Sequence, residues 1–306
     1  MLDRFLYYVI VMPLSHMPLW YIYLITDFFY LIIYHIKPYR KRVVMENIQR
    51  SFPEKTAEEH QQIARKFYGY FTDLLAESTK NLAISEKGMK KRLVVRNPEI
   101  MDQLYEQGKS VIFLSSHFNN WEPLITAQNL LFPHQAFGIG TPLSSKFWDK
   151  KINDRRERFG MKVTNAKNYK KALSSFTEKP SATLVLGDQS PGKNENCYWT
   201  NFLHQETAFF FGAEVMANQM DMAVVYGSIY RVKRGYYEIE LRLITDQPKK
   251  EEYGVITEKY IRILEDDIRE HPESWLWSHK RWKKDVPENL DEIKATHKKR
   301  FVERFR

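Results

Sequence analysis

Cysteine is almost absent from this chain, and glycine and proline are sparse. The 306 residues include one cysteine (Cys197), 12 glycines and 13 prolines. A single cysteine excludes an intramolecular disulfide and a cysteine metal cluster. The sequence also lacks a Walker A loop and a His/Cys metal spacing. Gly138-Ile-Gly140 is not a G-x-G-x-x-G turn, because no third glycine follows it. We therefore expect neither a bound metal nor a dinucleotide cofactor.

Apolar residues and positive charge are, by contrast, plentiful. The chain is 43% hydrophobic and 14% aromatic, which is enough for a packed interior. Its formal net charge is +9 at pH 7, with a pI near 9.3. Such a charge predicts an anionic partner, which is a nucleic acid, an anionic membrane, a phosphorylated lipid or an acidic carrier protein. Charge alone does not choose among them.

The N-terminus is nearly continuous apolar sequence from Phe5 to Ile36. Its second half, from Met17, is about as long as the ~20 residues that cross a bilayer, and its Trp and Tyr residues favour a membrane interface. A basic cluster follows immediately and comprises Lys37, Arg40, Lys41 and Arg42. It predicts that the C-terminal end of the apolar run stays on the cytoplasmic side of the membrane. Because Asp27 interrupts the run, a hydrophobic hairpin docked on the rest of the protein remains an alternative to a span.

The chain divides into a hydrophobic membrane segment with a basic juxtamembrane stretch, residues 1–50, and a second domain, residues 51–306. Within the second, a capping box at Thr56–Glu59 starts a helix. Strands are expected at 110–115, 136–140, 162–165, 182–187, 222–231 and 236–245. Helices are expected at 121–131, 144–159, 169–178, 207–220 and in the tail from residue 252. This alternation predicts an α/β fold with a mixed, largely parallel sheet flanked by helices.

One histidine and one glutamate follow the buried strand 110–115. Ligands of open α/β sheets bind outside the carboxyl ends of strands, and His117 lies at such an end. Asn120 can cap the next helix, which places Glu122 in its first turn. We expect the Glu122 carboxylate to fold back onto one imidazole nitrogen and leave the other free as a general base. A structural loop histidine is the alternative.

The wider pattern resembles the lipid A late acyltransferases, relatives of the lysophospholipid acyltransferases with an H-x4-D/E motif. The match comprises His117-Phe-Asn-Asn-Trp-Glu122, residues 153–160, Gly187-Asp-Gln189, Phe202-Leu203 with Thr207, and Pro272–Trp282. It covers nearly the whole chain. Asn119 and His204 stand where glycine is frequent in that family, which indicates a divergent branch.

This resemblance implies an O-acyltransferase of lipopolysaccharide biosynthesis on the cytoplasmic face of the bacterial inner membrane. His117 would act as base and Glu122 would orient it, without metal or organic cofactor. The partners would be an acyl carrier protein as donor, the membrane, and a lipid A precursor or related anionic lipid as acceptor. Another acceptor lipid (a lysophospholipid, aminolipid or pigment precursor) is an alternative. A membrane-tethered nucleic-acid-binding protein is the rival from another class, and we expect no nucleic acid partner.

Further side chains are candidates for substrate contact. Asn120, Arg155, Arg156, Arg158, Asp188 and Gln189 are the candidate substrate-binding residues. The arginines suit phosphate oxygens, although a solvated helix face is the alternative. Asp188 and Gln189 end a buried strand and should border the same cleft as His117. Phe202, Phe209, Phe210 and Phe211 are candidates for an acyl pocket, or else for the core. Trp275, Trp277 and Trp282, with neighbouring basic residues, are candidates for a membrane-surface anchor or for core packing.

Overall fold

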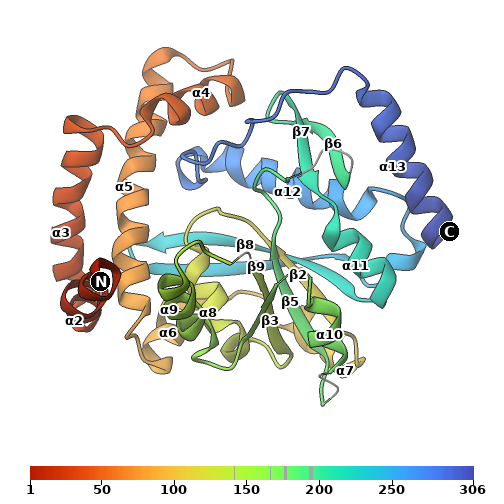
Figure 1. The fold of residues 1–306 in the computed structure, drawn as a ribbon, viewed down its shortest axis with the longest axis horizontal. Helices are drawn as coiled ribbons and strands as arrows, with labels where there is room; N and C mark the ends of the chain where they lie inside the picture. The colour runs from red at the N-terminus through yellow and green to blue at the C-terminus, as the bar shows by residue number, and fades with distance from the viewer. Residues whose placement is uncertain (141, 166, 176–177, 193–195) are drawn as a thin grey trace.

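The computed structural model describes residues 1–140, 142–165, 167–175, 178–192 and 196–306 (Figure 1). A seven-stranded sheet runs in the order β1-β9-β8-β2-β5-β3-β4. Its strands are β1 (Leu93–Val95), β2 (Val111–Ser115), β3 (Gln135–Gly140), β4 (Lys162–Asn165), β5 (Ser181–Leu186), β8 (Ala223–Lys233) and β9 (Tyr236–Thr245). Only β8 and β9 pair antiparallel within this sheet. The predicted α/β fold with a mixed, largely parallel sheet is confirmed.

Helices cover both faces of the sheet. β2 is buried along its whole length and alternates between two cores, with Ile112 and Leu114 in one and Val111 and Phe113 in the other. The first core joins α4 (Lys41–Ser51), α5 (Ala57–Asn81), α11 (Gly212–Met220) and α12 (Val255–Glu270); the second joins α6 (Glu86–Arg92), α7 (Glu99–Glu106) and α8 (Trp121–Leu131). A strand buried on both faces needs apolar side chains at every position, which explains its continuous apolar run.

The expected helix 207–220 is wrong in its first part. Residues Gln205–Phe210 form β7, which pairs antiparallel with β6 (Cys197–Phe202), a strand that the sequence analysis missed. Leu203 and His204 make the turn with φ of 49° and 65°. This left-handed conformation costs a side chain roughly 1–2 kcal/mol, so glycine is the usual residue there. The local pairing thus gives a physical reason for the glycine that the family resemblance led us to expect at position 204.

The C-terminal tryptophans are core residues, so the membrane-anchor interpretation of this segment is wrong. Trp275 and Trp277 are buried and Trp282 packs against the same core. The expected helical tail is interrupted between α12 and α13 (Leu290–Phe305), and these tryptophans lie in the interruption.

Two further helices lie between the strands, α9 (Lys146–Glu157) and α10 (Tyr169–Ser174). The expected helix 169–178 ends at Ser174, and its residues 176–177 lie outside the described part of the chain.

The N-terminal segment is a string of helices lying along α5 (Figure 1). It comprises α1 (Leu2–Phe5), η1 (Leu6–Val11), α2 (Met12–His16), α3 (Leu19–Leu31) and η2 (Ile32–Ile36). The helix Leu19–Ile36 is long and apolar enough to cross a membrane, and only 17% of it is buried in the protein. Leu19, Ile22 and Tyr23 pack against Ala76 of α5. Its large exposed side chains include Trp20, Tyr21, Leu24, Phe28, Phe29 and Leu31.

Candidate active site

Two neighbouring parallel strands bring the candidate catalytic residues together. β2 ends at Ser115 and β5 ends at Leu186, and the two strands pair in register at these residues. The chain beyond β2 carries His117, and the chain beyond β5 carries Asp188 and Gln189. Since the carboxyl ends of parallel strands meet at one edge of a sheet, the two segments face each other. The expectation that Asp188 and Gln189 border the same site as His117 agrees with this placement.

His117 and Asp188 form a hydrogen-bonded pair. The Nδ1 atom of His117 lies 2.7 Å from Oδ1 of Asp188. The other carboxylate oxygen, Oδ2, accepts hydrogen bonds from the His117 backbone N–H at 3.0 Å and from the Trp275 indole N–H at 2.9 Å. Burial raises the pKa of Asp188, but its attraction to His117 and these hydrogen bonds outweigh burial and leave the pKa below its ordinary value. Asp188 is therefore an ionised carboxylate, and it holds the imidazole by Nδ1.

The second ring nitrogen of His117, Nε2, lies beside Gln189. The His117 side chain is 15% exposed, whereas that of Asp188 is 2% exposed. Nε2 lies 3.1 Å from the side-chain nitrogen of Gln189, and the Trp121 ring packs edge-on at 4.7 Å between centroids. An amide N–H at Nε2 and a carboxylate at Nδ1 both require the tautomer protonated on Nδ1. Nε2 thus carries the lone pair that a general base needs.

Among the described residues, the Glu122 carboxylate makes no hydrogen bond to the imidazole, contrary to the expected contact, and its catalytic role stays a prediction. Its carboxylate is bound by Arg155, and its Oε1 lies 3.3 Å from Arg156, while the His117 ring nitrogens face Asp188 and Gln189. Burial raises the pKa of Glu122, but the two arginines outweigh it and lower the pKa below its usual value. Helix α9 presents this arginine pair to the first turn of α8. A guanidinium attracts a carboxylate more strongly than a neutral imidazole does, which explains the exchange of partners.

The loop between His117 and α8 is fixed by long-range contacts. Phe118 pairs with Trp275 in an antiparallel bridge, and the Asn119 N–H donates to the Ser274 carbonyl at 2.8 Å. Asn119 has φ of 53°, and its amide donates to the Ile229 carbonyl at 2.7 Å. Asparagine tolerates this left-handed conformation better than most residues, which explains how it replaces the glycine frequent in relatives. The loop holds His117 in one place.

Asn120 is the N-cap of α8, as the sequence predicted. Its side-chain oxygen accepts a hydrogen bond from the Glu122 N–H at 3.3 Å, and its amide donates to Glu77 at 2.5 Å. The residue is completely buried. Both of its polar groups therefore serve the protein itself, and a substrate contact for Asn120 remains only a prediction.

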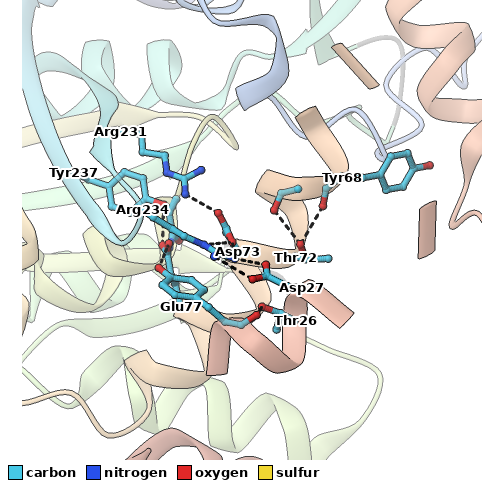
Figure 2. Close-up of polar contacts among 12 residues, drawn as sticks. Thr26, Asp27, Tyr68, Thr72, Asp73, Glu77, Arg231, Arg234 and Tyr237 are labelled. Carbon is cyan, nitrogen blue, oxygen red and sulfur yellow. Dashed lines mark hydrogen bonds and ion pairs between the residues drawn. The ribbon is translucent and has the colours of Figure 1, made fainter. Parts of the chain in front are cut away.

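A buried glutamate of α5 ties the apolar N-terminal helix to this loop. Glu77 accepts hydrogen bonds from Tyr23 of α3 at 2.8 Å and from Asn120. It also accepts one from Tyr237 of β9 at 2.7 Å (Figure 2). Burial raises the pKa of Glu77, and the three donors partly offset this effect. The sequence analysis missed this residue. Its signal is the spacing Asp73, Glu77 and Asn81, which sets three polar side chains along one face of an amphipathic helix.

The other candidate residues lie apart from the imidazole. Arg158 caps a helix end by donating to the carbonyls of Leu82, at 2.6 Å, and Ile84. Among the candidate acyl-pocket residues, Phe202 and Phe209 are fully buried in the core, and Phe211 is buried against Tyr253, His297 and Phe301. Phe210 is 44% exposed. As placed, Phe202, Phe209 and Phe211 fill space in the interior and Phe210 lies at the surface, and an acyl pocket at these rings stays a prediction.

An apolar cavity does lie beside the catalytic loop. It is lined by Phe67, Tyr70, Phe71, Leu74, Asn119, Trp121, Tyr237, Glu273, Ser274, Trp275 and Leu276. Its wall therefore includes Trp121, whose ring contacts His117, and Trp275, whose indole holds Asp188.

Comparison with known proteins agrees with this arrangement. The profile of the family described as "Bacterial lipid A biosynthesis acyltransferase" matches residues 1–284. A curated relative, the "Lipid A biosynthesis acyltransferase" of Haemophilus influenzae, is 24% identical over 245 residues, which cover 76% of this chain and 72% of the relative. The matched region includes the apolar N-terminus, the catalytic loop, both arginines of α9 and the tryptophan segment.

Proposed function

Because the chain belongs to the bacterial lipid A biosynthesis acyltransferase family, we propose that it transfers a fatty acyl group from acyl carrier protein to a hydroxyl of a lipid A precursor. The observation that carries the proposal is the His117–Asp188 pair at the carboxyl ends of β2 and β5, in which Asp188 binds Nδ1 and leaves the Nε2 lone pair as the base. The net charge of +9 suits both an acidic carrier protein and a phosphorylated acceptor.

The proposed reaction needs one base and no external cofactor. His117 Nε2 removes the proton of the acceptor hydroxyl, and the resulting alkoxide attacks the thioester carbonyl carbon. The C–S bond then breaks, the new ester C–O bond remains, and the protonated Nε2 gives its proton to the leaving thiolate. Asp188 stabilises the imidazolium between these steps, as the aspartate of a serine triad does. The acceptor hydroxyl takes the place of Gln189 at Nε2.

Glu122 has a different role in this proposal from the one that motif spacing suggested. It neutralises part of the charge of Arg155 and Arg156 and fixes both guanidinium groups beside the catalytic loop. Arg156 is 24% exposed in its side chain, whereas Arg155 is 7% exposed. Arg156 is thus the better placed of the two to contact an anionic substrate group, and the more buried Arg155 holds the Glu122 carboxylate that both arginines share.

The apolar cavity beside Trp121 is the better candidate for the acyl chain than the four phenylalanines. It touches the catalytic loop and is lined on its α5 side by Phe67, Phe71 and Leu74. The cavity has a volume of about 10 Å³, so an acyl chain enters it only when the partly exposed side chains of Phe71 and Leu74 change rotamer. Phe202 and Phe209 would instead have to leave a fully packed core, which costs about 3–5 kcal/mol for a large side chain.

The N-terminal helices attach the enzyme to the inner membrane in this proposal. The exposed apolar side chains of α3 and η1 support attachment, and the basic stretch around Arg40 supports the cytoplasmic side. Asp27, whose burial in lipid would be costly, is paired with Arg234 of the β8–β9 turn. The docking of α3 along α5 favours a helix that lies against the protein at the membrane surface.

The product of the purified protein tests the proposal. The full chain in detergent is supplied with acyl carrier protein loaded with one defined acyl group, and with a lipid A precursor. Mass spectrometry should show the acceptor heavier by that one acyl group. Free fatty acid as the sole product would replace the proposal with a hydrolase, and acylation of a lysophospholipid alone would replace the acceptor.

A further inference from the structure

A basic cleft lies between α5, α3 and the β8–β9 turn, away from the His117–Asp188 pair. It is a cavity of about 630 Å³ lined by Asp27, Tyr30, Gln62, Arg65, Lys66, Gly69, Tyr70, Thr72, Asp73, Arg231 and Arg234. Four of these side chains are cationic and two are carboxylates, so the lining carries an excess of two positive charges. None of the motifs that identify the active site explains this cleft.

The two arginines of β8 and its turn are held in fixed positions. Arg231 binds Asp73 at 2.5 Å and stacks over the Tyr70 ring at 4.4 Å. Arg234 bridges Asp73, at 2.5 Å, and Asp27 (Figure 2). The two arginines therefore face two carboxylates, Asp73 and Asp27, and the excess positive charge of the lining comes from the other two cations. Preorganised guanidinium groups suit the tetrahedral oxygens of a phosphate.

The other two cations lack acidic partners. Arg65 and Lys66 are exposed on α5, and no described carboxylate forms an ion pair with either. They stand one helical turn before Tyr70 and extend the basic lining along α5. Charge on this side of the cleft is therefore available to a ligand.

The cleft borders both the apolar helix and the active site. Around Asp27, the exposed side chains of α3 are Leu24, Phe28 and Leu31, which suit lipid tails. Tyr70 lines the basic cleft on one side and, on the other, the apolar cavity that reaches Trp121 beside His117. A ligand with acyl tails, a phosphate and a reactive hydroxyl fits these surfaces: its tails contact α3, its phosphate lies in the basic cleft, and its hydroxyl points toward His117. A free phosphate uses only the basic cleft.

We infer that this cleft binds a phosphate group of the acceptor glycolipid, with the Arg65–Lys66 pair supplying the free charge. The inference rests on the proposed function, since it identifies the acceptor of that reaction as an anionic, phosphorylated lipid. The cleft holds the phosphate on the α3 side of Tyr70, and the hydroxyl-bearing sugar extends past Tyr70 toward His117 without entering the apolar cavity, which stays free for the donor's acyl chain. Recognition of the acceptor phosphate thus lies mainly on α5, outside the His117–Glu122 motif.

Direct binding by a catalytically inert protein tests the inference separately from the reaction. The full-length His117→Ala protein in detergent is titrated with the phosphorylated acceptor and with the same lipid after enzymatic dephosphorylation. Arg65→Gln/Lys66→Gln in this background should weaken binding of the phosphorylated lipid at least about tenfold, a change of about 1.4 kcal/mol. It should leave the weaker binding of the dephosphorylated lipid unchanged. These exposed residues are chosen because their loss should not disturb folding, whereas loss of Arg231 would leave the buried Asp73 carboxylate without one of its ion-pair partners.

The matched control removes two positive charges from another basic cavity. Lys249→Gln/Lys250→Gln alters a cleft of about 540 Å³ at the opposite end of β2, lined also by Lys109, Asp221 and Asp246. The control should bind both lipids as the parent protein does. Equal weakening by both pairs would reduce the effect to net charge and overturn the inference.

A vesicle arm separates the acceptor from ordinary membrane lipid. The same variants are mixed with anionic vesicles that contain no acceptor. If Arg65→Gln/Lys66→Gln loses vesicle binding but keeps full affinity for the acceptor in detergent, the cleft serves bulk lipid and the inference is wrong. Failure of the parent enzyme to transfer acyl groups would overturn the proposed function instead, and it would leave this binding result standing.

Discussion

Replacing Asp188 with asparagine should remove most activity by giving His117 the wrong tautomer. The Asp188 carboxylate accepts three hydrogen bonds, from His117 Nδ1 at 2.7 Å, the His117 backbone N–H at 3.0 Å and the Trp275 indole at 2.9 Å. The asparagine amide has one oxygen and one NH₂ group. If its oxygen keeps the backbone and indole donors, its NH₂ faces Nδ1, which must then give up its proton to accept.

The proton of the imidazole would move to Nε2, where it cannot serve as a base. The equivalent change in a serine triad lowers kcat about 10⁴-fold, so we expect a loss of roughly 10³–10⁴-fold here. Loss of the charge also weakens hydrogen bonds that are worth about 1.5–3 kcal/mol each to an ionised group. The fold should nevertheless persist, since the amide still fills the same space and can accept from two of the donors.

Initial rates of acyl transfer measure the effect, with thermal melts to check folding. Glu122→Gln is the informative comparison, because Glu122 contacts Arg155 and Arg156 but neither ring nitrogen. It should lower kcat less than Asp188→Asn does and lower stability more, since breaking a buried ion pair costs about 3–5 kcal/mol. A folded Asp188→Asn enzyme within tenfold of the parent rate, beside an inactive Glu122→Gln enzyme, would refute the reasoning.

Three further outcomes follow from the same contacts. Deleting residues 1–36 should abolish membrane binding in fractionation and also lower the melting temperature, because Tyr23 and its neighbours leave α5 and Glu77 loses one donor; an unchanged melting temperature would contradict the packing. His204→Gly should raise the melting temperature, since φ of 65° costs a side chain roughly 1 kcal/mol or more, and a drop as large as that of His204→Ala would contradict this. The lowered pKa of Asp188 contributes stability that is present above its unfolded pKa of about 3.9 and is lost as the pH falls through the folded value. The melting temperature of Asp188→Asn should therefore fall less between pH 7 and pH 3 than that of the parent. Parallel curves of melting temperature against pH would contradict this expectation.

The sheet and the position of the base follow from local sequence patterns. The continuous apolar run before His117 predicts a strand buried on both faces, and strand ends are where α/β proteins bind ligands. The same rule brings Asp188 and Gln189 to His117, because both follow a strand. These features depend on period and order along the chain, which a sequence displays directly.

The partner of the imidazole depends on contacts that the sequence does not display. Glu122 is near His117 in the chain, yet α9 supplies Arg155, a stronger partner for its carboxylate, from more than thirty residues away. Likewise, Thr207–Phe210 pairs as a strand because residues 197–202 lie opposite, not because of its own pattern. The tryptophans of 275–282 look amphipathic in sequence, but they fill the core beside the catalytic loop.

The most direct test of the account is the rate of acyl transfer by the full-length His117→Ala protein, measured with acyl carrier protein donor and lipid A precursor. Loss of the base should lower the rate at least about 10²-fold while acceptor binding and the melting temperature stay near those of the parent. A folded variant that transfers acyl groups at the parent rate would contradict the assignment of His117 Nε2 as the base, and with it the mechanism built on the His117–Asp188 pair.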